Sequence, residues 1–161
     1  MARRQHLVGL AIIVVIFVFD QLTKAWILGL LEANNYRPIE VTSFFNLVLV
    51  INRGVSFGLF NSGGNESHWL LILLPGLVVV WLLFWMLRSK DVVATLGLSF
   101  VIGGAIGNIT DRIFRPGVID FFDFHAAGWH FWAFNIADSA ISVGVVLLIY
   151  DAIFGNQSKD A

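Results

Sequence analysis

The stretch Ala133-Phe-Asn-Ile-Ala-Asp-Ser-Ala140 opens an apolar segment that continues to Tyr150. Within it, Asn135 and Asp138 lie three residues apart, which is close to one turn of a helix. A carboxylate in apolar sequence is costly unless it is paired or used in function. Asp138 could instead cap the helix that follows, because Asp suits that position. The choice between a functional and a capping role for Asp138 depends on whether other segments place polar residues at the same depth.

The composition is that of a membrane protein. The 161 residues are 58% hydrophobic and 13% charged, whereas soluble domains are about 45–50% apolar and 25% charged. The net charge of −1 gives no indication of nucleic-acid binding. The absence of cysteine excludes disulfides, zinc–thiolate sites and cysteine nucleophiles. The four histidines show no metal-ligand spacing, so neither a metal nor a cofactor is expected.

Four apolar segments are long enough to cross a bilayer. They cover about residues 7–31, 69–87, 92–112 and 136–154. Between the first two, residues 34–62 combine β-branched and aromatic runs with turn residues, which predicts a small sheet. The expected strand segments are Tyr36–Thr42, Phe44–Asn52 and Val55–Phe60. The predicted fold is therefore an α-helical integral membrane protein, with four transmembrane helices and a small extracytoplasmic β-rich platform in one domain, 1–161.

Polar residues from three of these helices fall at one depth. Lys and Arg are densest at the two ends of the chain and at residues 88–91, which places both termini in the cytoplasm. At about 1.5 Å per residue, Asp20 lies roughly 20 Å from the cytoplasmic edge, and Asn108 and Asp138 lie roughly 24 Å from it. The hydrocarbon core is about 30 Å thick. Capping alone would not predict this coincidence in the outer third of the membrane.

A second carboxylate stands in the apolar run Val118-Ile-Asp-Phe-Phe122. If Asp120 and Asp138 lie close together, they could share a proton and activate a water molecule. Aspartic proteases use two carboxylates in this way.

Other polar residues have a structural reading as well as a functional one. Asp20 and Lys24 are four residues apart and could form an ion pair. Asp111 and Arg112 could form an ion pair at the membrane interface, or Arg112 could bind substrate. Asn52-Arg-Gly54 could be no more than a turn.

Three glycines in the third apolar segment, Gly103, Gly104 and Gly107, let helices approach closely. With these glycines permitting close approach, the apolar faces of the spans could form a groove for a lipid chain.

Five blocks together resemble the bacterial lipoprotein signal peptidases, also called type II signal peptidases, over nearly the whole chain. The blocks are Asp20-Gln-x-x-Lys24, Asn52-Arg-Gly54 with Phe57, Gly107-Asn-Ile-Thr-Asp-Arg112, Gly117-Val-Ile-Asp-Phe121 and Phe134-Asn-Ile-Ala-Asp-Ser139. The chain departs from the family pattern at Trp132, where the family often has Pro.

The resemblance implies an aspartic endopeptidase with Asp120 and Asp138 as its catalytic pair. Supporting or substrate-binding positions are expected at Asp20, Lys24, Asn52, Gly54, Asn108, Asp111, Arg112 and Asn135. The implied substrate is a prolipoprotein, cleaved before its diacylglyceryl-modified cysteine. The enzyme is expected to be a monomer among the lipids of the bacterial plasma membrane, with its active site near the extracytoplasmic face.

A small proton-coupled transporter or channel component is the alternative, because carboxylates inside membranes also relay protons. It would predict polar residues along the whole depth of the membrane. The inner two-thirds of each span is apolar apart from hydroxyls such as those of Thr95, Ser99 and Ser142, which disfavours it.

Overall fold

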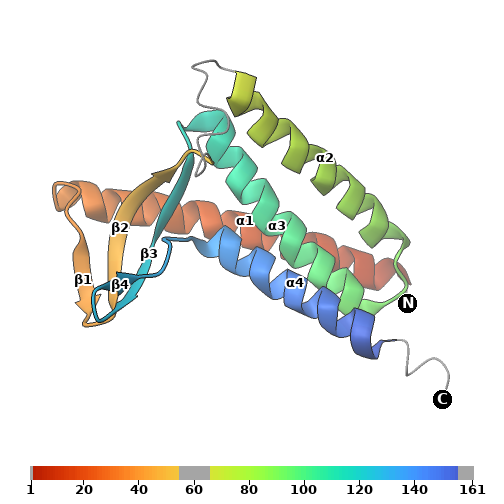
Figure 1. Ribbon diagram of the computed structural model, residues 1–161. Helices are drawn as coiled ribbons and strands as arrows, with labels where there is room; N and C mark the ends of the chain where they lie inside the picture. Colours follow the sequence, from red (N-terminus) through yellow and green to blue (C-terminus); the bar gives the residue numbers. More distant parts are fainter. Residues whose placement is uncertain (1, 55–65, 156–161) are drawn as a thin grey trace.

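Four long helices and one small sheet make up the described part of the chain (Figure 1). The computed structural model describes residues 2–54 and 66–155. The helices are α1 (Ala2–Ala33), α2 (Glu66–Arg88), α3 (Val92–Phe114) and α4 (Ile136–Phe154). Each contains a stretch that is long and apolar enough to cross a membrane. The predicted combination of four such helices with a small sheet is confirmed.

The first helix is longer than expected, beginning at Ala2 instead of residue 7 and ending at Ala33 instead of 31. Its first turns are held by Gln5 and His6, whose side chains both contact the Ser89 carbonyl oxygen, at 3.0 and 2.9 Å. At about 1.5 Å per residue its 32 residues span roughly 48 Å. That exceeds a hydrocarbon core of about 30 Å, so one end of α1 extends beyond it. Helices α2 and α3 are also slightly longer than expected.

The sheet is antiparallel, with strand order β1-β2-β3-β4. Its strands are β1 (Ile39–Thr42), β2 (Phe45–Asn52), β3 (Val118–Ala126) and β4 (Trp129–His130). Two of the strands, β1 and β2, come from the expected region 34–62, and the sheet also includes β3 and β4 from the connection between α3 and α4. β1 begins at Ile39 and not at Tyr36, since Asn35 and Tyr36 form a left-handed turn with φ of 54° and 57°. The expected strand Val55–Phe60 lies outside the described residues, and so does Phe57.

The C-terminal part of α1 supports the sheet. Figure 1 shows both at the left, past the ends of the other three helices. Ile27 and Leu31 of α1 form a buried cluster with Ile119 and Phe121 of β3. The sheet is therefore fixed to the helices by an apolar core of its own. This attachment sets the position of β3, the strand that carries Asp120.

Helix α3 packs against the other three helices. A methyl group added at Gly103 would lie 3.1 Å from the Ile13 carbonyl oxygen of α1, and one at Gly104 would collide with the Ala137 carbonyl oxygen of α4. A methyl group at Gly107 would lie 2.6 Å from Asp20 Oδ2. All three glycines are buried between helices. They therefore permit close packing of the helices, and a lipid groove along the apolar helix faces stays a prediction.

Candidate active site

Asp120 lies in β3 with its side chain buried, 1% exposed. Its two carboxylate oxygens accept hydrogen bonds from Asn52 Nδ2 at 3.0 Å and from Asn135 Nδ2 at 2.6 Å. The pKa of Asp120 is raised to about 6, mainly because the side chain is buried. The hydrogen bonds from the two amides lower this pKa, but by less than burial raises it. The negative charge of Asp138 contributes to this increase. Asp120 is thus a carboxyl that gains a proton more readily than a free one.

Asp138 lies in the first turn of α4 and is half-buried. Its Oδ1 accepts a hydrogen bond from Asn108 Nδ2 at 2.7 Å, and its Oδ2 accepts one from the Asn135 backbone N–H at 3.2 Å. Asn135 Oδ1 in turn accepts from the Asp138 backbone N–H at 3.0 Å. This is a capping box, in which Asn135 is the N-cap. The alternative that Asp138 itself is the N-cap was wrong.

Asn135 contacts both carboxylates. Its side-chain amide donates to Asp120, while its backbone N–H donates to Asp138. The amide also contacts Asn108 Oδ1 at 3.3 Å, so the donors to the two carboxylates are themselves connected. A single buried residue therefore contacts two carboxylates that lie 18 positions apart in the sequence.

A buried lysine connects the elements beneath the pair. Lys24 Nζ is 2.8 Å from Asp20 Oδ2 and 2.8 Å from Asp111 Oδ2, and all three side chains are buried. Asp20 Oδ1 accepts a hydrogen bond from the Ala137 backbone N–H at 3.0 Å, and Asp111 Oδ2 accepts one from the Ile119 backbone N–H at 3.2 Å. Ala137 and Ile119 directly precede the two candidate catalytic residues. We call Asp20, Lys24 and Asp111 the brace, because they fix the backbone before each carboxylate.

Two members of this network were missed in the sequence. Gln21 Nε2 donates to Asp20 Oδ2 and to Asp111 Oδ1, each at 3.1 Å. Arg115 forms an ion pair with Asp111, four residues before it in α3. The same i, i+4 spacing predicts the pair of Asp20 and Lys24, so it could also have indicated this one. The alternative in which Asp111 forms an ion pair with Arg112 was wrong, because Asp111 is paired with Lys24 and Arg115.

Arg112 lies beside the carboxylates without an ion pair to any described residue. Its guanidinium donates to the Asn108 carbonyl oxygen at 3.3 Å, and its buried Nε has no partner among the described residues. The positive charge of Arg112 acts on Asp138 and Asp120. The Arg112 guanidinium therefore brings a positive charge close to both carboxylates.

Asn52 and Gly54 form the predicted turn. Gly54 has φ of 73°, a left-handed conformation that favours glycine, and its N–H donates to Asn52 Oδ1 at 2.9 Å. This bond leaves Asn52 Nδ2 directed at Asp120, at the 3.0 Å given above. The turn thus orients the amide that holds one carboxylate.

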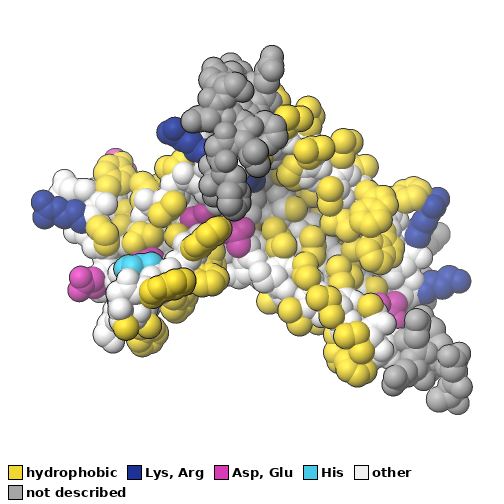
Figure 2. Space-filling view, in the orientation of Figure 1, with side chains coloured by type: hydrophobic (Ala, Val, Ile, Leu, Met, Phe, Trp, Pro, Cys, Tyr) yellow, Lys and Arg dark blue, Asp and Glu magenta, His cyan; other side chains and the backbone are white. Residues whose placement is uncertain are grey.

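Each carboxylate lines its own open cleft. The Asp120 cleft is also lined by Val50, Ile51, Asn52, Arg53, Gly54, Trp132 and Ala133, and its volume is about 460 Å³. The Asp138 cleft is also lined by Phe131, Trp132, Ala133, Phe134, Ser139 and Ser142, and its volume is about 440 Å³. In Figure 2, acidic side chains reach the surface where the sheet meets the helices, beside a largely hydrophobic helical face.

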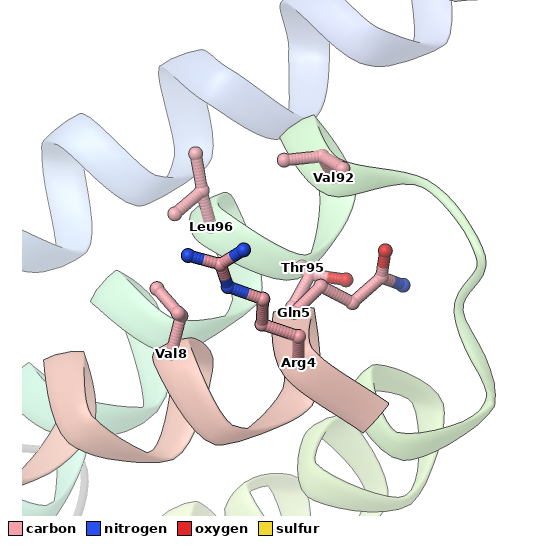
Figure 3. A pocket seen from close by; sticks show the side chains of 6 residues that line it. All are labelled: Arg4, Gln5, Val8, Val92, Thr95 and Leu96. Carbon is pink, nitrogen blue, oxygen red and sulfur yellow. The ribbon is translucent and has the colours of Figure 1, made fainter. Parts of the chain in front are cut away.

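A separate cleft lies between the first turns of α1 and α3 (Figure 3). Its lining residues are Arg4, Gln5, Val8, Val92, Thr95 and Leu96. No carboxylate lines it, so it is not part of the candidate active site.

The chain matches known proteins over most of its length. Residues 12–154 match the family model described as signal peptidase (SPase) II. A lipoprotein signal peptidase of Burkholderia vietnamiensis is 44% identical over 146 residues, which are 89% of this chain and 86% of the relative. One of Rhodopseudomonas palustris is 43% identical over 157 residues, which are 95% and 96% of the two chains.

The fold is also that of a solved structure. A bacterial membrane enzyme superimposes with a TM-score of 0.75 at 26% identity, over 96% of this chain and 92% of that one. With the match to the family model and the similarity to these relatives, the chain belongs to the signal peptidase II family.

Proposed function

We propose that this protein is an aspartic endopeptidase that removes signal peptides from prolipoproteins in the bacterial plasma membrane. Cleavage takes place before the diacylglyceryl-modified cysteine, and the enzyme acts as a monomer of one membrane-embedded domain. Family membership and the relatives' names as lipoprotein signal peptidases support the substrate. The observation that carries the aspartic mechanism is the contact of Asn135 with both Asp120 and Asp138.

In the proposed mechanism the two carboxyl groups share one proton. Asp120 holds it, because Asp120 is buried and its pKa is raised to about 6. Asp138 is more exposed and takes a proton from a water molecule, whose oxygen attacks the scissile carbonyl carbon. Protonated Asp120 donates a hydrogen bond to the carbonyl oxygen as negative charge develops on it, and Arg112 adds positive charge. The C–N bond then breaks, and the leaving nitrogen takes up the proton that Asp138 accepted.

The position of the pair suggests why the substrate must carry a lipid. By the depth argument above, Asp138 lies in the outer third of the membrane. A diacylglyceryl group beside the scissile bond anchors it at that depth, with about 0.8 kcal/mol per buried methylene. Much of this anchoring already exists in the membrane-bound precursor, so the lipid acts mainly by fixing depth and register.

The proton-coupled transporter is disfavoured by how the deeper hydroxyl groups are used. Ser99 donates to the Thr95 carbonyl oxygen at 2.6 Å, and Thr95 donates to the Asp91 carbonyl oxygen at 2.6 Å. Hydroxyls that bond to their own helix add little to a proton path across the membrane. Among the described spans, the polar side chains that contact one another across helices, such as Asp20, Lys24 and Asp111, lie at one level and do not form a path across the membrane.

The test is a processing assay with the purified protein and a prolipoprotein, supplied with and without its diacylglyceryl group. Wild-type protein is expected to cleave only the lipid-modified form. Asp120→Asn and Asp138→Asn are expected to lose at least about 1,000-fold in rate, because an amide cannot exchange the required proton.

Asp123→Asn is the matched control. Asp123 is also a buried carboxylate of β3, but it is bonded to His130 and Asn46 and lines neither cleft. This variant is expected to keep activity. Near-normal turnover in Asp120→Asn or Asp138→Asn would reject the pair, and equal cleavage of both precursors would reject the need for the lipid.

A further inference from the structure

The cleft between the first turns of α1 and α3 combines a positive charge with an apolar wall. Its volume is about 280 Å³, and Val8, Val92 and Leu96 form most of the wall. In Figure 3 the Arg4 side chain extends toward Val8 and Leu96, which line the same cleft. Of the described residues that line it, Arg4 is the one that carries a charge. The cleft therefore suits a ligand that is both negatively charged and apolar.

The other polar side chains of this cleft are already hydrogen-bonded within the protein. Gln5 Nε2 donates to the Ser89 carbonyl oxygen at 3.0 Å, and Thr95 Oγ1 donates to the Asp91 carbonyl oxygen at 2.6 Å. Arg4, in contrast, has no hydrogen bond or ion pair to another residue in the described part of the chain. The charge of Arg4 is thus what the cleft offers to a ligand.

The two walls of the cleft are fixed without a ligand. Gln5 and His6 of α1 both contact the Ser89 carbonyl oxygen in the connection that precedes α3. Asp91 caps α3, and its Oδ1 accepts a hydrogen bond from the Val93 N–H at 2.8 Å. The first turns of both helices are therefore held in place. A preformed site loses less conformational entropy when a ligand binds.

The charge and the apolar wall lie at successive depths of the membrane. Arg4 precedes the apolar segment of α1, which begins at residue 7. Val8 follows four residues later, about 6 Å further along the helix axis. Val8 is 47% exposed and Leu96 is half-buried, so both present apolar surface to the cleft. A charged group at the membrane surface with apolar surface directly below it matches the two parts of a phospholipid.

We propose that this cleft binds an anionic glycerophospholipid, with its phosphate at Arg4 and the upper part of one acyl chain against Val8 and Leu96. In the expected orientation this end of the helices lies at the cytoplasmic leaflet. The surface of that leaflet is negative, and basic pockets between transmembrane helices bind anionic head groups there. The bound lipid fills the space between α1 and α3 at the end of the helices opposite the sheet. The inference does not depend on the proposed peptidase chemistry.

Native mass spectrometry of the purified protein in an uncharged detergent tests this. The two probes are dioleoyl phosphatidylglycerol, which is anionic, and dioleoyl phosphatidylcholine, which has the same acyl chains and no net charge. Wild-type protein should bind the first lipid about 5-fold more tightly when it is phosphatidylglycerol, the gain from one basic residue near an anionic surface.

Three variants separate the charge from the apolar wall. Arg4→Gln should bring the two affinities close together by weakening phosphatidylglycerol, whereas Arg4→Lys should keep most of the preference because it keeps the charge. Val8→Phe should weaken both lipids, because the larger ring fills part of the cleft. A wild-type protein that does not distinguish the lipids, or an Arg4→Gln variant that keeps the preference, would overturn the inference.

Lys90→Gln is the matched control, since Lys90 is an exposed basic residue of the connection between α2 and α3 and does not line the cleft. It should keep the preference for phosphatidylglycerol. An equal loss in Lys90→Gln and Arg4→Gln would assign lipid binding to the overall charge of this end and overturn the site.

A second measurement distinguishes a lipid from a free phosphate ion. Phosphatidylglycerol should raise the melting temperature of wild-type protein, and inorganic phosphate at the same concentration should leave it unchanged. An equal rise with inorganic phosphate would reject the lipid as the ligand of this cleft.

Discussion

At the scale of single residues, asparagine amides hold the candidate catalytic carboxylates. Asp120 accepts from Asn52 and Asn135, and Asp138 accepts from Asn108. Amides are neutral donors, so they orient a carboxylate without adding a positive charge. A neighbouring Lys or Arg in their place would favour the ionised form much more strongly. The asparagines therefore lower the pKa of Asp120 only in part, and burial still raises it to about 6.

The raised pKa of Asp120 predicts how stability depends on pH. From an ordinary value of 3.8 to about 6 in the folded protein, the change corresponds to roughly 3 kcal/mol. The folded state binds more protons than the unfolded state between about pH 4 and 6, so the Asp120 contribution to the unfolding free energy falls as pH rises through that window. Asp120→Asn removes this dependence. Relative to wild type, the variant should gain stability from pH 4 to 6 and show no further relative change above it.

Thermal unfolding in detergent, from pH 4 to 8, measures this difference. Only its pH dependence is diagnostic, because the amide introduced by Asp120→Asn has one acceptor oxygen and must lose one of the two hydrogen bonds from Asn52 and Asn135. Asp123→Asn serves as the comparison from the same strand. A difference between Asp120→Asn and wild type that stays constant from pH 4 to 8 would contradict the raised pKa.

At the scale of elements, the brace connects α1, α3, the start of β3 and the start of α4. Lys24→Met should be strongly destabilising, by about 3–5 kcal/mol, because it leaves the carboxylates of Asp20 and Asp111 buried with less compensating charge. Activity should fall with it, since the backbone before each candidate catalytic residue loses its anchor. Urea or thermal unfolding and the processing assay measure the two effects. Combining Lys24→Met with Asp20→Asn and Asp111→Asn removes all three charges, and this triple variant should be more stable than Lys24→Met alone. Equal stability of the two would show that unbalanced buried charge does not cause the destabilisation.

Gly107 tests the contact between α3 and α1. A methyl group there would lie 2.6 Å from Asp20 Oδ2, so Gly107→Ala should displace Asp20 and lower both activity and melting temperature. Gly76→Ala in α2 is the control, because nothing lies within 4 Å of a methyl group at that position. Alanine also favours helix by about 1 kcal/mol over glycine, so the control should be neutral or stabilising. Equal melting temperatures and activities for the two variants would refute the packing argument.

The fold could be predicted from the sequence where a pattern is local. The apolar spans follow from composition, and the level shared by Asp20, Asn108 and Asp138 follows from helical rise. The strand around Asp120 could not be predicted, because its Val, Ile and Phe neighbours form a continuous apolar run without the alternation of a one-sided strand. The contact of Asn135 with Asp120 depends on how β3 pairs with β2 and packs on α1. Such tertiary contacts leave no local sequence pattern.

At the scale of the whole molecule, the sheet lies at the opposite end of the helices from the start of α1 and the end of α4. Figure 1 shows the N-terminus, the connection from α2 to α3 and the end of α4 at one end, with the sheet at the other. The first of these ends carries the higher density of Lys and Arg, from which we expect it to face the cytoplasm. The candidate active site adjoins the sheet. We therefore expect it to face the extracytoplasmic side, where the mature part of a prolipoprotein emerges.

Cysteine labelling tests this orientation directly, because the natural chain has no cysteine. Ser43→Cys lies in the exposed turn between β1 and β2, and Lys90→Cys lies in the exposed connection between α2 and α3. A maleimide that cannot cross membranes should label Ser43→Cys in intact spheroplasts. It should label Lys90→Cys only after the membrane is opened, because charged residues of that connection stay with the cytoplasmic face. Labelling of Lys90→Cys in intact spheroplasts would invert the topology. It would also place the carboxylate pair on the side where no lipid-modified cysteine is presented.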